Sequence, residues 1–363
     1  MNLRPTTNNQ AGFSLIEMLI AITVMLVLMG GIMSLVRGSM MISVATYEMT
    51  DAQENLRTAQ EYINRDLINA GDGLKTMSVI RLPEAFIRSY LTLSPVIDPL
   101  DNMPSGTINF GILTSDNNVP AGTVVTAANP AATVRTLADG TGTDRQTILE
   151  IDPRFAALTP SAINAAGTIV TLPAGTTAAT IALFSPGEVY FFTSSLGGTF
   201  ATLTAVDTAT KVLTFAVGGA DLNYGLNVAG VNNNIKAISS SGTLATSLQR
   251  MLIIHYYVNS SSFLMRRVFG VQGATFRDSI IAEHVLNVQF KYSLETTDAL
   301  GNIVQPTSML STKSERLGAR QVEVTISVET PHALQNNATT KLQMTTSTSV
   351  RNMQFRRAVQ PGS

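Results

Sequence analysis

The sequence predicts an α+β fold in which one long N-terminal helix packs on an antiparallel β-sheet body. Three patterns predict it: an apolar run at 13–36, a helical periodicity that continues to residue 70, and strict alternation of apolar and polar residues near the C-terminus. The chain has 363 residues, enough for a sizeable buried core. The expected organisation is a leader at 1–12, the helix at 13–70, and an exported β-rich globular domain at 71–363 with an inserted β subdomain at about 107–245.

The first half of the predicted helix has the length and composition of a membrane span. A span needs about 20 apolar residues, and 13–36 supply them with one carboxylate, Glu17. The preceding segment is polar, carries Arg4 and contains no acid, which predicts that the N-terminus stays in the cytoplasm. A cleavable secretory signal fits poorly, because the run exceeds the usual core of roughly 7–15 residues and no Ala-x-Ala site closes it. A plain signal anchor explains the length of the apolar run but not Glu17. An acid in lipid costs about a few kcal/mol, and a simple anchor gives it no role.

The second half of the predicted helix is amphipathic. No proline occurs between Phe13 and Ala70, and Gly71 is placed to end the helix, which would have about 58 residues and a length of about 87 Å. Gly30 and Gly31 each weaken the helix by about 1 kcal/mol relative to Ala, which predicts either a flexible point or close helix packing in lipid. A narrow apolar stripe, suited to packing on a sheet, consists of Ile42, Ala45, Met49, Ala52, Leu56, Ala59, Ile63 and Leu67.

Beyond residue 73 the periodicity changes to two. Residues 321–329 and 288–294 alternate as half-buried antiparallel strands do, and 251–258 and 263–269 flank 259–262, which predicts a hairpin. These strands are expected to form the sheet that receives the helix stripe. The middle of the chain is rich in Ala, Thr, Gly and Asn, and short candidate strands there predict the inserted subdomain: 147–151, 168–172, 189–193, 199–205 and 212–217.

The composition excludes several classes of function. Charged residues make up 13% of the chain and the net charge is −1, which gives no electrostatic footprint for nucleic acid. The absence of cysteine excludes disulfides, thiolate metal sites and cysteine nucleophiles. No catalytic motif is present either, so we predict a non-enzymatic protein without cofactor or metal.

The few residues that could take part in catalysis or metal binding are expected to have structural or solvated roles. His255 lies in a predicted strand, where a structural histidine is the expected interpretation. Asp144, Glu150 and Asp152 match no standard cation loop, so we expect them to be solvated.

The hexapeptide Gly12-Phe13-Ser14-Leu15-Ile16-Glu17 resembles the processing site of the type IV prepilin family, whose leaders are called class III signal peptides. The resemblance implies that prepilin peptidase cuts between Gly12 and Phe13 and that Phe13 becomes N-methylated. It also implies that Glu17 neutralises the Phe13 ammonium of an adjacent subunit during assembly. The physical logic is consistent, because cleavage there retains the apolar run and Glu17 lies one helical turn after Phe13.

Further along the chain, 56–71, 285–292 and 350–352 resemble PilW-type minor pilins. This resemblance implies a structural subunit that helps to prime assembly of a type IV pilus, with a place at the pilus tip as one option. The implied partners are prepilin peptidase, other minor and major pilins, the inner-membrane assembly platform and, before assembly, the lipid bilayer. The implied localisation is the inner membrane, crossed once, and then the pilus at the cell surface.

Two alternatives share part of this pattern. Pseudopilins of type II secretion systems have the same construction, although their corresponding subunit is usually much shorter. A membrane-anchored surface adhesin or enzyme is the third hypothesis.

Overall fold

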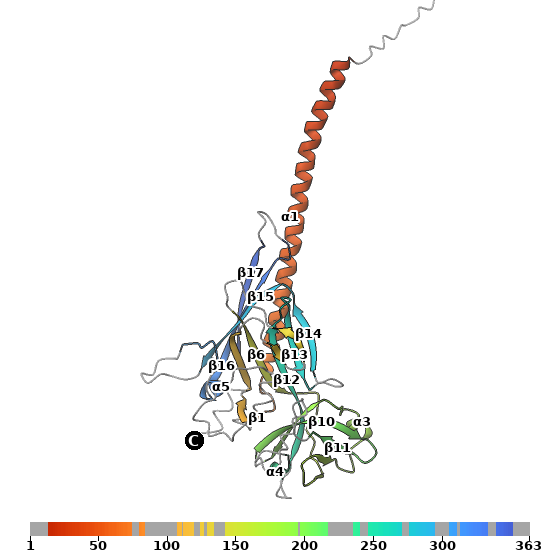
Figure 1. Cartoon of the computed structure of the whole chain (residues 1–363), viewed down its shortest axis with the longest axis vertical. Helices are drawn as coiled ribbons and strands as arrows, with labels where there is room; N and C mark the ends of the chain where they lie inside the picture. The colour runs from red at the N-terminus through yellow and green to blue at the C-terminus, as the bar shows by residue number, and fades with distance from the viewer. Residues whose placement is uncertain are drawn as a thin grey trace, which may run out of the picture. The chain divides into compact units, whose positions relative to one another are not determined.

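The computed structural model describes residues 14–74, 80–83, 107–110, 112–119, 124–126, 129–133, 142–194, 197–216, 235–239, 246–270, 276–294, 305–310, 313–332 and 339–350. The chain divides into two compact units, the first comprising 1–51 with 330–340 and the second 52–329 with 341–363. Helix α1 (Leu15–Asn69) contributes to both units and is drawn in red and orange in Figure 1. Within the first unit, His332 Nδ1 lies 2.7 Å from Glu48 Oε1.

Helix α1 confirms the predicted long helix, with 55 residues, and its end is set by glycine. Gly71 has a φ of +75°, a left-handed conformation that residues with a Cβ adopt only at a cost. Its N–H donates to the Leu149 carbonyl at 2.8 Å, and a Cβ at this position would lie 2.6 Å from Ile112 Cδ1. Both the backbone conformation and the close packing therefore require glycine where the helix stops.

The body consists of antiparallel sheets, so the predicted α+β architecture is confirmed. The largest has ten strands in the order β14-β13-β12-β9-β10-β11-β8-β7, with β6 also pairing with β12 and with β3. Its strands are β3 (Leu113–Val119), β6 (Thr143–Ile151), β7 (Ala162–Ile163), β8 (Ile169–Thr171), β9 (Val189–Ser194), β10 (Gly197–Asp207), β11 (Val212–Phe215), β12 (Ser247–Val258), β13 (Leu264–Phe269) and β14 (Phe276–Ala282).

A second sheet has the order β15-β16-β17, from Val285–Leu294, Ala319–Glu329 and Lys341–Ser349. Side chains of β16 alternate between buried and partly exposed along almost the whole strand, as the sequence predicted. Two small sheets pair β1 (Ile80–Pro83) with β2 (Thr107–Phe110) and β4 (Val124–Thr126) with β5 (Asn129–Thr133). The short helices are α3 (Ala178–Ile181), α4 (Ile235–Ser239) and α5 (Lys313–Gly318).

The main hydrophobic core joins the end of α1 to both large sheets. Ala52, Leu56, Ala59, Ile63 and Leu67 are buried in it with residues of β6, β12, β15 and β16. The stripe thus packs on sheet strands as predicted, but the strands expected to form one sheet belong to two: β12 and β13 lie in the ten-stranded sheet, and β15 and β16 in the second sheet. In the first unit the stripe is not covered: Ile42 is 62% exposed and Met49 is 37% exposed. The stripe is therefore buried only from Ala52 onward.

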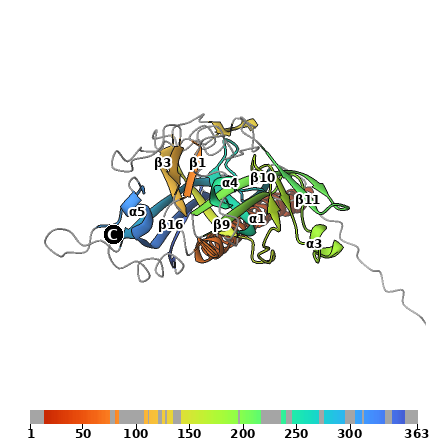
Figure 2. The same ribbon diagram turned by 90° about the horizontal axis from the view of Figure 1, so that it is seen from below.

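A second core lies in the middle of the chain and is aromatic. Phe155, Phe184 and Tyr190 have ring centroids within 5.5 Å of one another, and Phe192 meets Phe215 edge to face at 5.1 Å. Its strands β10 and β11 lie close to α3 in both views (Figures 1 and 2). Strand β9 pairs with β12, so the middle of the chain continues the ten-stranded sheet. The five strands predicted here are present, while their separation as an inserted subdomain stays a prediction.

Candidate functional site

The first half of α1 is the candidate membrane segment. It is long and apolar enough to cross a bilayer. Its large apolar side chains point outward around the helix: Leu15 is 84% exposed and Val27 is 76% exposed. Such a surface has no favourable place in water, because apolar area left exposed forfeits about 25 cal/mol per Å². The segment therefore needs lipid or other helices around it.

Glu17 caps the N-terminus of this helix. Its Oε2 accepts a hydrogen bond from the backbone N–H of Ser14 at 3.0 Å. A glutamate three residues after an N-terminal serine is the arrangement of a capping box, which satisfies an amide that has no partner inside the helix. The carboxylate also lies at the positive end of the helix dipole. Sequence reasoning missed this role, although the Ser-x-x-Glu spacing was readable.

Of the other predicted residues of this segment, the structure describes the two internal glycines alone. Gly12 and Phe13 lie outside the described residues, so cleavage and methylation stay predictions. Gly30 and Gly31 lie inside α1, which continues through them without interruption. No atom lies within 4 Å of a Cβ built on either glycine, so their small size leaves open space on the helix surface.

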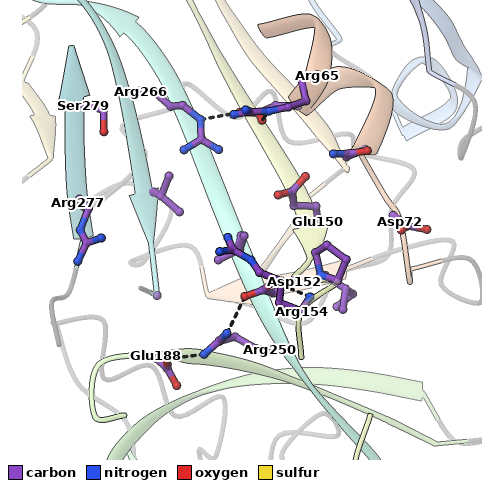
Figure 3. Close-up of a pocket in the computed structure, with 17 residues that line it drawn as sticks. Arg65, Asp72, Glu150, Asp152, Arg154, Glu188, Arg250, Arg266, Arg277 and Ser279 are labelled. Atoms are coloured by element: carbon purple, nitrogen blue, oxygen red, sulfur yellow. Dashed lines mark hydrogen bonds and ion pairs between the residues drawn. The ribbon is translucent and has the colours of Figure 1, made fainter. Parts of the chain in front are cut away.

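A charged cleft of about 610 Å³ is the second candidate site, and it lies wholly in the second unit. It is lined by the end of α1 and by residues of β6, β12, β13 and β14 (Figure 3). Glu150 and Asp152 line it and Asp144 does not. All three acids are buried, so the prediction that they are solvated is wrong. Among the described residues, no group of three His, Asp or Glu side chains could hold a metal ion.

Asp144 has a structural role instead. Its two carboxylate oxygens accept hydrogen bonds from the backbone N–H groups of Asn118 at 2.9 Å and Phe290 at 2.8 Å. It thereby joins β6 to β3 and β15. Burial raises its pKa to about 6, against the opposing effect of these two bonds.

Two arginines neutralise three of the other buried acids of the cleft, Asp66, Asp152 and Glu188. Arg250 donates to Asp152 from Nε at 3.0 Å and Nη2 at 2.8 Å, and to Glu188 from Nη1 at 2.8 Å. Arg266 Nε donates to Asp66 Oδ2 at 2.6 Å, and the Tyr256 hydroxyl donates to the same oxygen at 2.7 Å. Asp66 thus ties the last turns of α1 to β12 and β13. Asp66 is buried next to Leu67 on α1, and the apolar stripe in the sequence did not predict a buried acid at this position.

His255 is fully buried, and its Nδ1 lies 2.8 Å from Thr147 Oγ1. Burial lowers its pKa well below the usual 6.5, and the nearby Arg145 and Arg267 lower it further. The ring is therefore neutral at physiological pH, as expected of a structural histidine.

A family model of the prokaryotic N-terminal methylation motif matches residues 7–33. The match supports a type IV prepilin-like class for this chain. No curated protein and no solved structure matches the chain. The motif implies processing by prepilin peptidase and partners in pilus or secretion machinery. With the apolar first half of α1, it fits anchoring in the inner membrane, and it points to a structural role.

Proposed function

We propose that this chain is a minor pilin, a structural subunit that helps to prime assembly of a type IV pilus. The coincidence of the methylation motif at 7–33 with a 55-residue helix, apolar and exposed in its first half, carries the proposal. In this proposal the chain is inserted with its N-terminus in the cytoplasm, cut after Gly12 and methylated at Phe13. The membrane half of α1 then moves from lipid into the filament, among the helices of other pilins.

The proposed assembly contact joins Glu17 to the new amino terminus of a neighbouring subunit. Cleavage would create an ammonium group at Phe13 in an apolar environment, where an unpaired charge is costly. Glu17 lies in the first turn of α1. Among the described residues its bond to the Ser14 amide occupies Oε2 alone, which leaves Oε1 for the ammonium group.

The minor pilin and the pseudopilin differ in the fibre that contains them. The length of the exported body favours the pilus subunit. The test is deletion of the gene in the native host, followed by electron microscopy of the surface, mass spectrometry of sheared fibres, and an assay of protein secretion. We expect this chain in the sheared fibres and a loss of pili from the deletion strain.

Other outcomes of the same experiment would contradict the proposal. Normal piliation with lost secretion would identify a pseudopilin. A cell-bound chain missing from fibres, with piliation unchanged, would indicate an anchored adhesin or enzyme.

A further inference from the structure

The charged cleft of the second unit contains one acid that differs from the rest. Four of the residues described above, Asp66, Asp152, Arg250 and Arg266, neutralise one another in ion pairs. Glu188 is bonded to Arg250. Glu150 is only 7% exposed, and its Oε2 has no hydrogen-bond partner among the described residues. A buried carboxylate without a partner costs free energy, so this position needs an explanation.

The arginines beside Glu150 already interact with another carboxylate. Its carboxyl group points toward the side of the cleft that holds Arg65 and Arg266 (Figure 3). Arg266 is already bonded to Asp66, and Arg65 lies 3.5 Å from the same acid and is 55% exposed to solvent. The local arginines are thus shared with another carboxylate.

The end of α1 adds negative potential to the same cleft. Asn69, its last residue, lines the cleft, and Asp72 follows at the rim. A helix C-terminus carries a partial negative charge, and the last turn of α1 contains no basic residue to offset it. Arg277 lies on β14 on the side of the cleft away from Asp72 (Figure 3), and Arg154 is 3.5 Å from Asp152.

Apolar side chains also line the cleft. Leu252 on β12 and Val268 on β13 both line it. Long basic side chains place an aliphatic stem on such a surface and keep the charged end on a polar group. The cleft therefore offers both an apolar contact and a carboxylate oxygen, Glu150 Oε2, that has no hydrogen-bond partner among the described residues.

We propose that this cleft binds a lysine or arginine side chain of another protein, with Glu150 as the carboxylate that receives its charge. The aliphatic stem packs on Leu252 and Val268, and the ammonium or guanidinium group donates to Glu150. Burial and the nearby Asp66 raise the pKa of Glu150 to about 7, so binding of the cation displaces a proton from a fraction of the molecules. The inference does not depend on processing at Gly12.

The test uses the full chain in detergent micelles and saturation-transfer difference NMR. The probe is Nα-acetyl-lysine N-methylamide, and the control probe is the norleucine analogue, which has the same stem without the ammonium group. We expect the lysine probe to bind at least about tenfold more tightly than the norleucine probe. Glu150→Gln should abolish this preference, while Glu323→Gln, a half-exposed acid on β16 outside the cleft, should leave it unchanged.

A pH series on the unmodified protein gives a second readout that needs no variant. The charged fraction of Glu150 rises about tenfold between pH 6 and pH 8 for a pKa near 7, so the affinity for the lysine probe should rise by about the same factor. A third measurement uses 1,4-diaminobutane to distinguish a protein side chain from a free amine as the ligand. Tighter binding of the diamine than of the lysine probe would assign the site to a free amine and contradict the proposal. Equal binding of the lysine and norleucine probes, or full affinity in folded Glu150→Gln, would overturn the proposal.

Discussion

At the scale of single residues, two glutamates occupy opposite situations. Glu17 is surrounded by exposed apolar side chains yet bonded to the Ser14 amide. Glu150 is buried among charged groups, and its Oε2 has no hydrogen-bond partner in the part of the chain that the structure describes. The first is explained by a cap that the Ser-x-x-Glu spacing encodes. The second depends on residues that meet only in the folded chain, because Arg266 and Asp66 are 200 positions apart.

Substitution of Glu17 separates its two roles. Glu17→Gln keeps a hydrogen-bond acceptor for the Ser14 amide but loses the charge, whereas Glu17→Ala loses both and should weaken the cap by about 1 kcal/mol. Both variants should insert in the membrane, and both should be strongly depleted from sheared fibres because the ammonium group of Phe13 lacks a counter-charge. Glu61→Ala, an exposed acid farther along α1, is the control. Normal amounts of Glu17→Gln in the fibres would contradict the charge pairing and leave only the cap.

The elevated pKa of Glu150 predicts a pH-dependent cost to stability. The pKa in the folded state is about 7, against 4.5 in the unfolded chain, so between these values the folded state binds more protons. The free energy of unfolding therefore falls as pH rises through this window, by about 3 kcal/mol at most. Glu150→Gln removes the effect, and its urea unfolding midpoint should exceed that of the unmodified protein more at pH 8 than at pH 5. A difference between the two proteins that does not change with pH would contradict this prediction.

At the scale of elements, helix α1 combines two segments with different surroundings. Its apolar run, its amphipathic stripe and its glycine stop are local patterns, and these were predicted from the sequence, as were the alternating strands of the body. The extent of burial was not predictable. Met49 and Leu56 belong to the same stripe, yet only Leu56 is buried, because burial depends on where the sheets pack and not on the period of the stripe.

Gly71 tests the account of where α1 ends. Gly71→Ala must place a Cβ at a φ of +75° and within 2.6 Å of Ile112 Cδ1, which should lower the free energy of unfolding by about 2–3 kcal/mol. Gly175→Ala is the matched control, since no atom lies within 4 Å of a Cβ there, and it should change stability by less than about 0.5 kcal/mol. Urea titrations followed by far-UV circular dichroism measure the unfolding midpoints of both variants. Equal midpoints for the two variants would mean that the helix can end without this glycine.

At the scale of the whole molecule, the chain combines an N-terminal helix long and apolar enough to cross a bilayer with a body of antiparallel sheets. The motif at 7–33 supports the prepilin-like class, and the exposed apolar half of α1, which overlaps the motif, is consistent with it. No local sequence pattern predicted the charged cleft of the body, because its lining comes from the end of α1 and from four strands distant from it in sequence.

Mass spectrometry of the N-terminal peptide, from protein purified out of its native host, tests the central claim most directly. Prepilin processing predicts a first residue of N-methylated Phe13, and its loss in a strain without prepilin peptidase. A chain that begins at Met1, or at an unmethylated residue elsewhere, would contradict the account.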